Sequence, residues 1–359
     1  MSYRVTEYSP RFKDQIAALR CRVFGGTQAF AVKYFTWKYE QNPYLKEQPL
    51  FYIALHEGNV VGMLGAYGSQ WRAGRSQKSW IIPCSAEFAV DPDHQRHGLG
   101  QQLSAYKSED TARKGYKYSM HLSANRSSLR LQPKLQFERV ATYHSFQRGI
   151  ERTLLARGRR KLKRLIGSRQ IETPFRNFDI WAAQSSGSII GALEPRISEM
   201  SDLVSRYCSE SATRHARDTC FYRWRFADPS SVYRFIFYVQ GGSMAGFFVL
   251  HQSTSGGRTT IVDWETSTQV AWSKLLHAVA ESNAQNLVIT SMAFSEGQTQ
   301  TLLRMGFESV HVLNTATNPA PGIFLWELAN NSTVNGDLDF RGSPSSSKLD
   351  VRMICSDAF

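Results

Sequence analysis

The feature of this sequence that most constrains its fold is an internal repeat. The segments YFTWKYEQNPY and CFYRWRFADPS align Trp37 with Trp224, and each is followed by two apolar, strand-like runs. The offset is 187 residues at the tryptophans and 184 residues between Gly62 and Gly246. An offset that shrinks along the chain is typical of duplicated domains with trimmed loops. The alternative is a coincidence between two aromatic strand patterns.

Length and composition agree with a two-domain globular protein. At about 100 to 200 residues per domain, 359 residues predict about two domains. Hydrophobic residues make up 42% of the chain, which is enough for a packed core. No apolar run approaches the roughly 18 residues of a membrane span, and the first 15 residues do not resemble a secretory signal. We therefore expect a cytoplasmic protein.

The cysteines argue against a disulfide framework and against a metal site. The chain has five, an odd number, and no two of them form a CxxC pair. We expect them to be reduced packing residues, and we expect no metal.

Charge and repeat boundaries together suggest four segments. We predict a first domain at 1–147, a basic linker at 148–175, a second domain at 176–330 and a polar C-terminal tail at 331–359. Nine basic residues and one acidic residue lie within 148–169, a large part of the net charge of +13. We favour a solvated linker there, while contact with a nucleic acid or an anionic membrane surface is the open alternative.

The most informative stretch is AEFAVDPDHQRHGLGQQLSAYK. Gly98 and Gly100 fall between an expected strand and an expected helix that runs to about Lys114, and the segment 117–122 follows as a buried strand. Backbone N–H groups at such a helix start can bind an anion, which suits a diphosphate. The stretch is not a Walker loop, because no Gly-Lys-Ser/Thr follows, and it lacks the third glycine of the dinucleotide fingerprint.

The loop resembles that of the GCN5-related N-acetyltransferase (GNAT) superfamily, which reads Q/R-x-x-G-x-G/A. The residues that match are Gln95, Arg96, His97, Gly98, Leu99 and Gly100. The family's downstream pattern N-x-x-A-x-x-x-Y-x-K-x-G-F also keeps its register, over Asn125, Ser128, Gln132, Lys134, Gln136 and Phe137. The two motifs in this order are far more specific than either alone.

The resemblance implies an α/β (α+β) fold of tandem GNAT-like domains, each a mixed, mostly antiparallel twisted sheet flanked by helices. It implies acetyl-CoA as the acyl donor, bound between two splayed strands. Its diphosphate would bind the loop amides of residues 95–100, and its pantetheine would pair with the backbone of Phe88, Ala89 and Val90. Asn125 would contribute from the following helix.

Catalysis also needs a base and a group that assists the leaving thiolate. In this family a direct attack by the amine needs a proton acceptor, and Glu87 is our first candidate for that base, with His121 next. The alternative role for Glu87 is that of a structural partner for a lysine or arginine, and His121 could be a packing residue. Gln132 stands where the family has its thiolate-protonating tyrosine, so Gln132 itself, Tyr143 or His144 would have to assist the leaving group.

The second repeat differs from the first where the cofactor would bind. It reads IVDWETSTQVAWSK where the first has the QRHGLG loop, and it contains no glycine there. We therefore expect a degenerate GNAT-like domain without a phosphate site.

The function that follows is an acyl-CoA-dependent N-acyltransferase acting on a small amine. The segment from Trp37 to Pro43 resembles those of tandem chains associated with amino-sugar and surface-polysaccharide biosynthesis. An amino sugar, free or nucleotide-linked, is therefore the first acceptor to consider. Two alternatives remain open. One is an aminoacyl-tRNA-dependent transferase, although such proteins generally lack an intact pyrophosphate loop, so we expect no nucleic acid partner. The other is a non-catalytic acyl-CoA-binding module.

Overall fold

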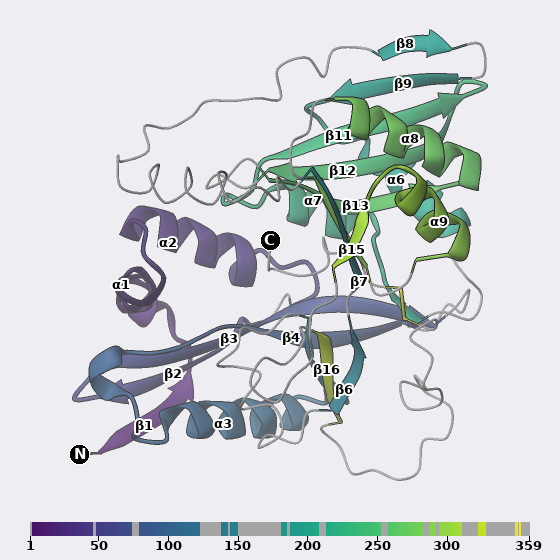
Figure 1. The fold of residues 1–359 in the computed structure, drawn as a ribbon. Coiled ribbons are helices and arrows are strands. Elements are labelled where there is room, and N and C mark those ends of the chain that lie inside the picture. Colours follow the sequence, from purple (N-terminus) through teal and green to yellow (C-terminus); the bar gives the residue numbers. More distant parts are fainter. Residues whose placement is uncertain are drawn as a thin grey trace.

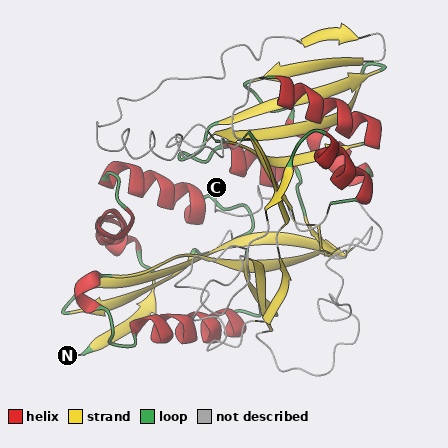
Figure 2. Cartoon of the chain, viewed as in Figure 1, coloured by secondary structure: helices red, strands yellow, loops and turns green. Residues whose placement is uncertain are grey.

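The structure is a computed structural model that carries side chains. It describes residues 2–45, 48–73, 79–122, 138–142, 144–149, 181–184, 187–207, 213–252, 258–282, 287–291, 294–310, 322–327, 349–350 and 352. Two mixed sheets lie one above the other, with helices between them and on their outer faces (Figures 1 and 2).

The first sheet is built mainly from the first half of the chain. Its central strands are antiparallel, apart from a parallel pair of β4 and β5. In spatial order the strands are β1 (Tyr3–Glu7), β2 (Leu50–His56), β3 (Asn59–Ala73), β4 (Ser79–Val90), β5 (Tyr118–His121), β16 (Gly322–Glu327) and β6 (Glu138–Thr142), while β10 (Thr213–His215) joins β3 and β17 (Leu349–Asp350) joins β10.

The second sheet repeats this plan with the second half of the chain. Here β13 and β14 are the parallel pair. In spatial order the strands are β15 (Glu308–Val310), β7 (His144–Arg148), β14 (Leu287–Ser291), β13 (Thr259–Thr266), β12 (Ser243–Gln252), β11 (Tyr233–Gln240), β9 (Gly187–Ala192) and β8 (Trp181–Gln184).

Helices cover both faces of each sheet. Helix α3 packs on the outer face of the first sheet, whereas α1 and α2 lie on its inner side (Figure 1). The helical segments are η1 (Pro10–Phe12), α1 (Lys13–Phe24), α2 (Gln28–Phe35), the π-helix η2 (Thr36–Glu40), η3 (Pro92–His94), α3 (Leu99–Arg113), α6 (Ile197–Arg206), α7 (Thr219–Phe226), α8 (Gln269–Glu281) and α9 (Glu296–Arg304). None of the helices in the described ranges is both long enough and apolar enough to cross a membrane.

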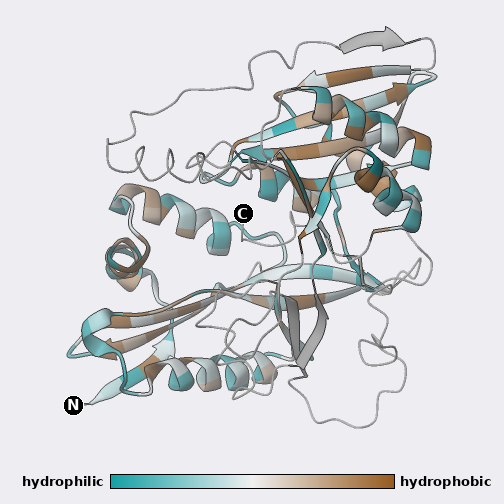
Figure 3. Cartoon of the chain, in the orientation of Figure 1, coloured by the Kyte–Doolittle hydropathy of each residue, from teal (hydrophilic) through white to brown (hydrophobic). Residues whose placement is uncertain are grey.

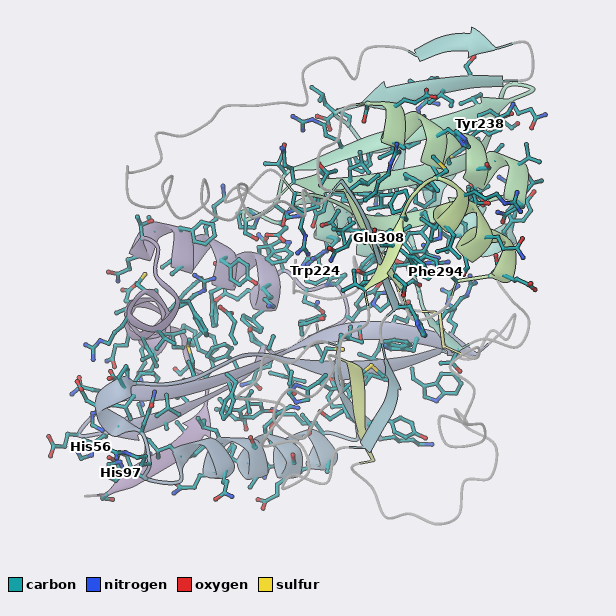
Figure 4. All side chains as sticks on the ribbon, in the orientation of Figure 1. His56, His97, Trp224, Tyr238, Phe294 and Glu308 are labelled. Atoms are coloured by element: carbon teal, nitrogen blue, oxygen red, sulfur yellow. The ribbon has the colours of Figure 1, made fainter. Side chains whose placement is uncertain are left out.

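The repeat expected from the sequence is present in three dimensions, at its tryptophans. The indole N–H of Trp37 donates to the backbone carbonyl of Trp224 at 2.7 Å, and that of Trp224 donates to the carbonyl of Trp37 at 2.8 Å. The two rings stack with centroids 5.1 Å apart and planes 11° apart. Reciprocal bonds of this kind are what a pseudo-two-fold axis produces. Figure 4 places Trp224 between the two sheets.

The two repeats share a core and exchange strands. One buried cluster joins Tyr67, Trp71 and Ile82 of the first sheet to Phe235 and Phe247 of the second. Hydrophobic residues accordingly lie along strands of both sheets (Figure 3). Strand β16, from late in the chain, lies between β5 and β6, and β7 lies between β14 and β15. Strand pairing therefore crosses the boundary predicted at residue 147, and each sheet needs a strand from the other half of the chain.

Candidate acyl-CoA site

The candidate site is the fork where β4 and β5 separate. These parallel strands share one register pair, Cys84 with Met120. Beyond it, the segment 85–90 of β4 continues in register with β3 alone, as far as the described residues show. The edge of β4 at Phe88, Ala89 and Val90, which the sequence assigns to the pantetheine, therefore carries backbone groups that a ligand can pair with.

A β-bulge turns the chain at the fork. The register of β4 against β3 shifts between Met63 and Gly65, so two residues of β4, Glu87 and Phe88, oppose one residue of β3. Glu87 has a φ of 51°, in the left-handed region that a non-glycine residue adopts rarely. As a result, the Glu87 side chain lies on the same face of the sheet as α1, while Phe88 packs with the α3 cluster.

Both carboxylate oxygens of Glu87 are engaged. Oε1 accepts from Arg20 Nε at 2.6 Å, and Oε2 accepts from the Tyr39 hydroxyl at 2.9 Å. A Cβ on Gly65 would lie 2.3 Å from the Tyr39 hydroxyl, so glycine is required there for Tyr39 to reach the bulge. Glu87 thus has the arginine partner that was the alternative to a base, and its part in proton transfer stays a prediction.

The loop between β4 and α3 has the backbone that an anion site needs. Arg96 and Gly98 have φ values of 68° and 74°, and Gly98 is the left-handed N-cap of α3. No side chain caps this helix, and its first turn has no acidic residue. The loop residues 95–98 are exposed. The N–H groups at the start of α3 are therefore left without a side-chain cap, at a place where the helix dipole favours an anion.

Side chains around the loop fix its distance from β4. A Cβ on Gly100 would come within 2.9 Å of the Phe88 ring, which explains the second glycine of the motif. Gln95 Nε2 donates to the backbone carbonyl of Val90 at 3.2 Å and ties the loop to the end of the strand. Leu99 is buried, whereas the ring of His97 lies 5.6 Å from that of Tyr3 at the molecular surface (Figure 4).

The other predicted site residues are placed only in part. His121 is half-buried and ends β5, next to Met120 of the fork pair, and it pairs with Phe324 of β16. Asn125, Gln132 and Tyr143 lie outside the described residues. His144 lies in β7 of the second sheet, exposed and opposite Ser291.

Sequence reasoning missed a polar cluster beneath the fork. The Lys107 ammonium of α3 donates to Ser85 Oγ of β4 and to Ser119 Oγ of β5, each at 2.5 Å. All three residues are buried, and burial lowers the pKa of Lys107 to about 7. A signal was available, because residues 99, 103 and 107 form an i, i+4, i+8 stripe that faces the sheet.

The second repeat has no comparable anion site at the same place. Thr268 caps α8 there, and its hydroxyl accepts from the backbone N–H of Ala271 at 3.1 Å. Near the fork of β13 and β14, Arg352 forms an isolated bridge with Ser291 and places its guanidinium 4.1 Å from the Trp264 ring centroid. The chain's own residues thus fill part of this region.

Metal ligands and cysteines add nothing to the site. Within the described ranges, no group of three or more histidine, cysteine or acidic residues could hold a metal ion. Cys21, Cys84 and Cys220, which lie in these ranges, form no disulfide bond.

Comparisons with known proteins agree with this geometry. Residues 17–137 match the family model described as "Acetyltransferase (GNAT) family". No curated protein sequence is significantly similar to the chain.

Among solved structures, three chains illustrate the similarity. A probable N-acyltransferase from Enterococcus faecalis has a TM-score of 0.63 at 12% identity, and a GCN5-related N-acetyltransferase from Anabaena variabilis has 0.62 at 12%; each match covers 91% of this chain and 73% of the other. A tandem GNAT protein from the clavulanic acid biosynthesis pathway has 0.53 at 10% identity, over 91% of this chain and 99% of its own.

At such identities the structures show a shared fold, and the tandem GNAT arrangement is part of it. The family match, in turn, covers the fork, the bulge and the loop of residues 95–100. Residues 17–137 of this chain are therefore similar to the GNAT family of acetyltransferases, within a fold that solved GNAT proteins share.

Proposed function

We propose that the protein transfers an acetyl group from acetyl-CoA to a small amine by direct attack in a ternary complex. The observation that carries this proposal is the uncapped N-terminus of α3, with Gly98 in the left-handed conformation, beside the open edge of β4. A diphosphate would accept from the loop amides of residues 95–100. A pantetheine arm would pair with β4 at Phe88, Ala89 and Val90.

The proposed reaction balances without a covalent enzyme intermediate. The neutral amine forms a bond to the thioester carbon and loses a proton to a base, the carbon–sulfur bond breaks, and CoA leaves as a thiolate that takes up a proton to become the free thiol. A fixed backbone N–H of β4 would stabilise the negative oxygen that develops before this break. A thiolate needs less help from a general acid than an alkoxide, since the pKa of a parent thiol is about 8.5. The absence of a tyrosine at Gln132 is therefore compatible with turnover.

The bulge gives Glu87 a positioning role in this proposal. Its carboxylate is bonded to α1 through Arg20 and to η2 through Tyr39, and these bonds hold the strained residue between Ala86 and Phe88. Both carboxylate oxygens are already bonded within the chain. We accordingly assign Glu87 to holding the cofactor edge of β4, and we place His121 next in line for the base.

An amino sugar, free or nucleotide-linked, is the acceptor we propose to test first. The experiment is calorimetry with acetyl-CoA, followed by a thiol-release assay over a panel of amino sugars, nucleotide-linked amino sugars and amino acids. We expect one acetyl-CoA per chain and turnover with at least one amine. Binding without turnover for every amine would favour a non-catalytic module, and no acetyl-CoA binding would favour a different acyl donor.

A further inference from the structure

The cluster of Ser85, Lys107 and Ser119 lies where the two cofactor strands part. Ser85 follows Cys84 on β4, and Ser119 precedes Met120 on β5; Cys84 and Met120 are the register pair of these strands. One ammonium group bonded to both hydroxyls therefore ties β4 to β5 at the origin of the fork.

The same helix carries the anion site. Helix α3 begins at Leu99, directly after the loop, and reaches Lys107 two turns later. The Tyr52 hydroxyl donates to Asp110, at 2.8 Å, and links the next turn of α3 to β2. Any shift of α3 would thus move both the diphosphate amides and the origin of the fork.

The second repeat shows that the fold does not need this polar cluster. A Cβ on Gly62 would meet Leu103 of α3, and a Cβ on the aligned Gly246 would meet Leu275 of α8. Leu103 and Leu275 are therefore equivalent, and so are the residues four positions later, Lys107 and Val279.

Around Val279 the second repeat is apolar. Ile261 of β13 and Ile289 of β14 are register partners, and both pack with Val279 in one fully buried cluster. The same chain thus fills the corresponding place once with a lysine and two serines and once with aliphatic side chains.

The polar cluster of the first repeat requires a charged group to be removed from water on folding, which the apolar cluster of the second repeat does not. Removing an ammonium group from water disfavours folding, and apolar replacement of a buried charged cluster is often neutral or stabilising. Burial already lowers the pKa of Lys107. Breaks in packing rules of this kind concentrate at functional sites.

We propose that Lys107, through Ser85 and Ser119, is a positioning residue that sets the separation of β4 and β5 and thereby holds the acyl donor's thioester for attack. This inference rests on the proposed acetyl transfer. Lys107 itself touches no reacting atom, because it approaches the fork from the α3 side of the sheet.

The test is a variant that makes the cluster apolar, Ser85→Ala, Lys107→Met and Ser119→Ala together. We expect its melting temperature to equal or exceed that of the wild type, because apolar replacement of a buried charged cluster is often neutral or stabilising. Affinity for acetyl-CoA should stay within about threefold, less than the tenfold that 1.4 kcal/mol represents. The kcat should fall by about 10- to 100-fold, because misplacement by about 1 Å can cost that much.

Lys114→Met is the matched control. It also removes a lysine from α3, but from its exposed end, where the ammonium bonds Glu7 and Asp110. Its kcat should stay near the wild-type value. If the triple variant is folded and its kcat is also within about twofold of the wild type, well below the effect of misplacement, the inference is overturned.

Single variants keep the test decisive if the triple variant does not fold. Ser85→Ala removes one of the two acceptors, and Ser85→Thr keeps a hydroxyl there. We expect kcat to fall in the first and to be restored in the second. Equal kcat values in both would overturn the inference, whereas a wild type that turns over no amine would overturn the proposed function and this role with it.

Discussion

Helices α3 and α8 begin at equivalent places in the two repeats, but only α8 has a side-chain cap at its start. Helix α3 begins after an exposed left-handed Gly98 and has no side-chain cap. Helix α8 begins after Thr268, whose hydroxyl satisfies the N–H of Ala271. A capped helix start has used part of its anion-binding capacity within the chain. The first repeat thus leaves these backbone donors without a side-chain cap, whereas the second uses its Thr268 hydroxyl to satisfy one of them.

The two parallel forks differ in the same sense. In the first repeat a bulge at Glu87 interrupts β4, and a lysine bridges the strands below it. In the second, the register of β13 against β12 also shifts, with Val262 as the extra residue between Ile261 and Asp263, but no residue of β13 has a positive φ. Strain and buried charge are thus found together at the fork that we assign to acetyl-CoA.

The largest effect, a loss of affinity for acetyl-CoA, is expected from Gly98→Asp. The change places a carboxylate beside the proposed diphosphate and a side chain at a φ of 74°. Calorimetry should show acetyl-CoA affinity reduced by about 100-fold or more, since like-charge contact costs several kcal/mol and 1.4 kcal/mol is a factor of ten.

Gly242→Asp is the control for Gly98→Asp. Gly242 has a φ of 77° in the turn between β11 and β12, with no heavy atom within 4 Å of an added Cβ. It therefore reproduces the backbone strain and the charge in the second repeat, and affinity should not change. Unchanged affinity in a folded Gly98→Asp variant would remove the donor site from this loop.

A smaller effect is expected from Glu87→Gln. The amide keeps the shape but weakens the bonds to Arg20 and Tyr39, so the bulge should loosen and kcat should fall about tenfold, less than the roughly 10²- to 10⁴-fold loss of a general base. Steady-state rates from neutral to alkaline pH measure this. A loss above 10²-fold that recovers partly at high pH would instead make Glu87 the base. Glu40→Gln, which removes a carboxylate bonded to Lys13 and Tyr8 away from the bulge, is the control.

The pseudo-two-fold symmetry of the repeats can be tested at Trp37 and Trp224. Trp37→Phe and Trp224→Phe each remove one of two equivalent hydrogen bonds, so each should lower the free energy of unfolding by about 1 kcal/mol. Because the rings stack on each other, the double variant should lose less than the sum. Urea unfolding measures all three. Strongly unequal single effects would show that the two repeats do not contribute alike to their interface.

No change in the affinity for acetyl-CoA is expected from Thr266→Asp. The residue ends β13, where the second repeat has a capped helix instead of a phosphate loop. Acetyl-CoA affinity should match the wild type, with one molecule bound per chain. Two acetyl-CoA molecules bound per wild-type chain would contradict the expectation that only the first repeat binds the donor.

The sequence alone determined the features that depend on local pattern. Gly98 and Gly100 placed the loop, because a left-handed turn and the close approach of Phe88 require glycine. The apolar spacing after Gly98 predicted the helix now seen as Leu99–Arg113, and the segment 117–122 predicted the strand Tyr118–His121. The repeat aligned Trp37 with Trp224 before their contact was known.

Tertiary structure alone decided the partners. Arg20, Tyr39 and Glu87 come from a helix, a π-helix and a strand, and no local spacing connects them. Lys107 belongs to a helix stripe that faces the sheet, but its partners Ser85 and Ser119 come from two separate strands, which the sequence does not bring together. The exchange of β7 and β16 between sheets was also hidden, because strand pairing is non-local and a sequence pattern marks a strand without naming its neighbour.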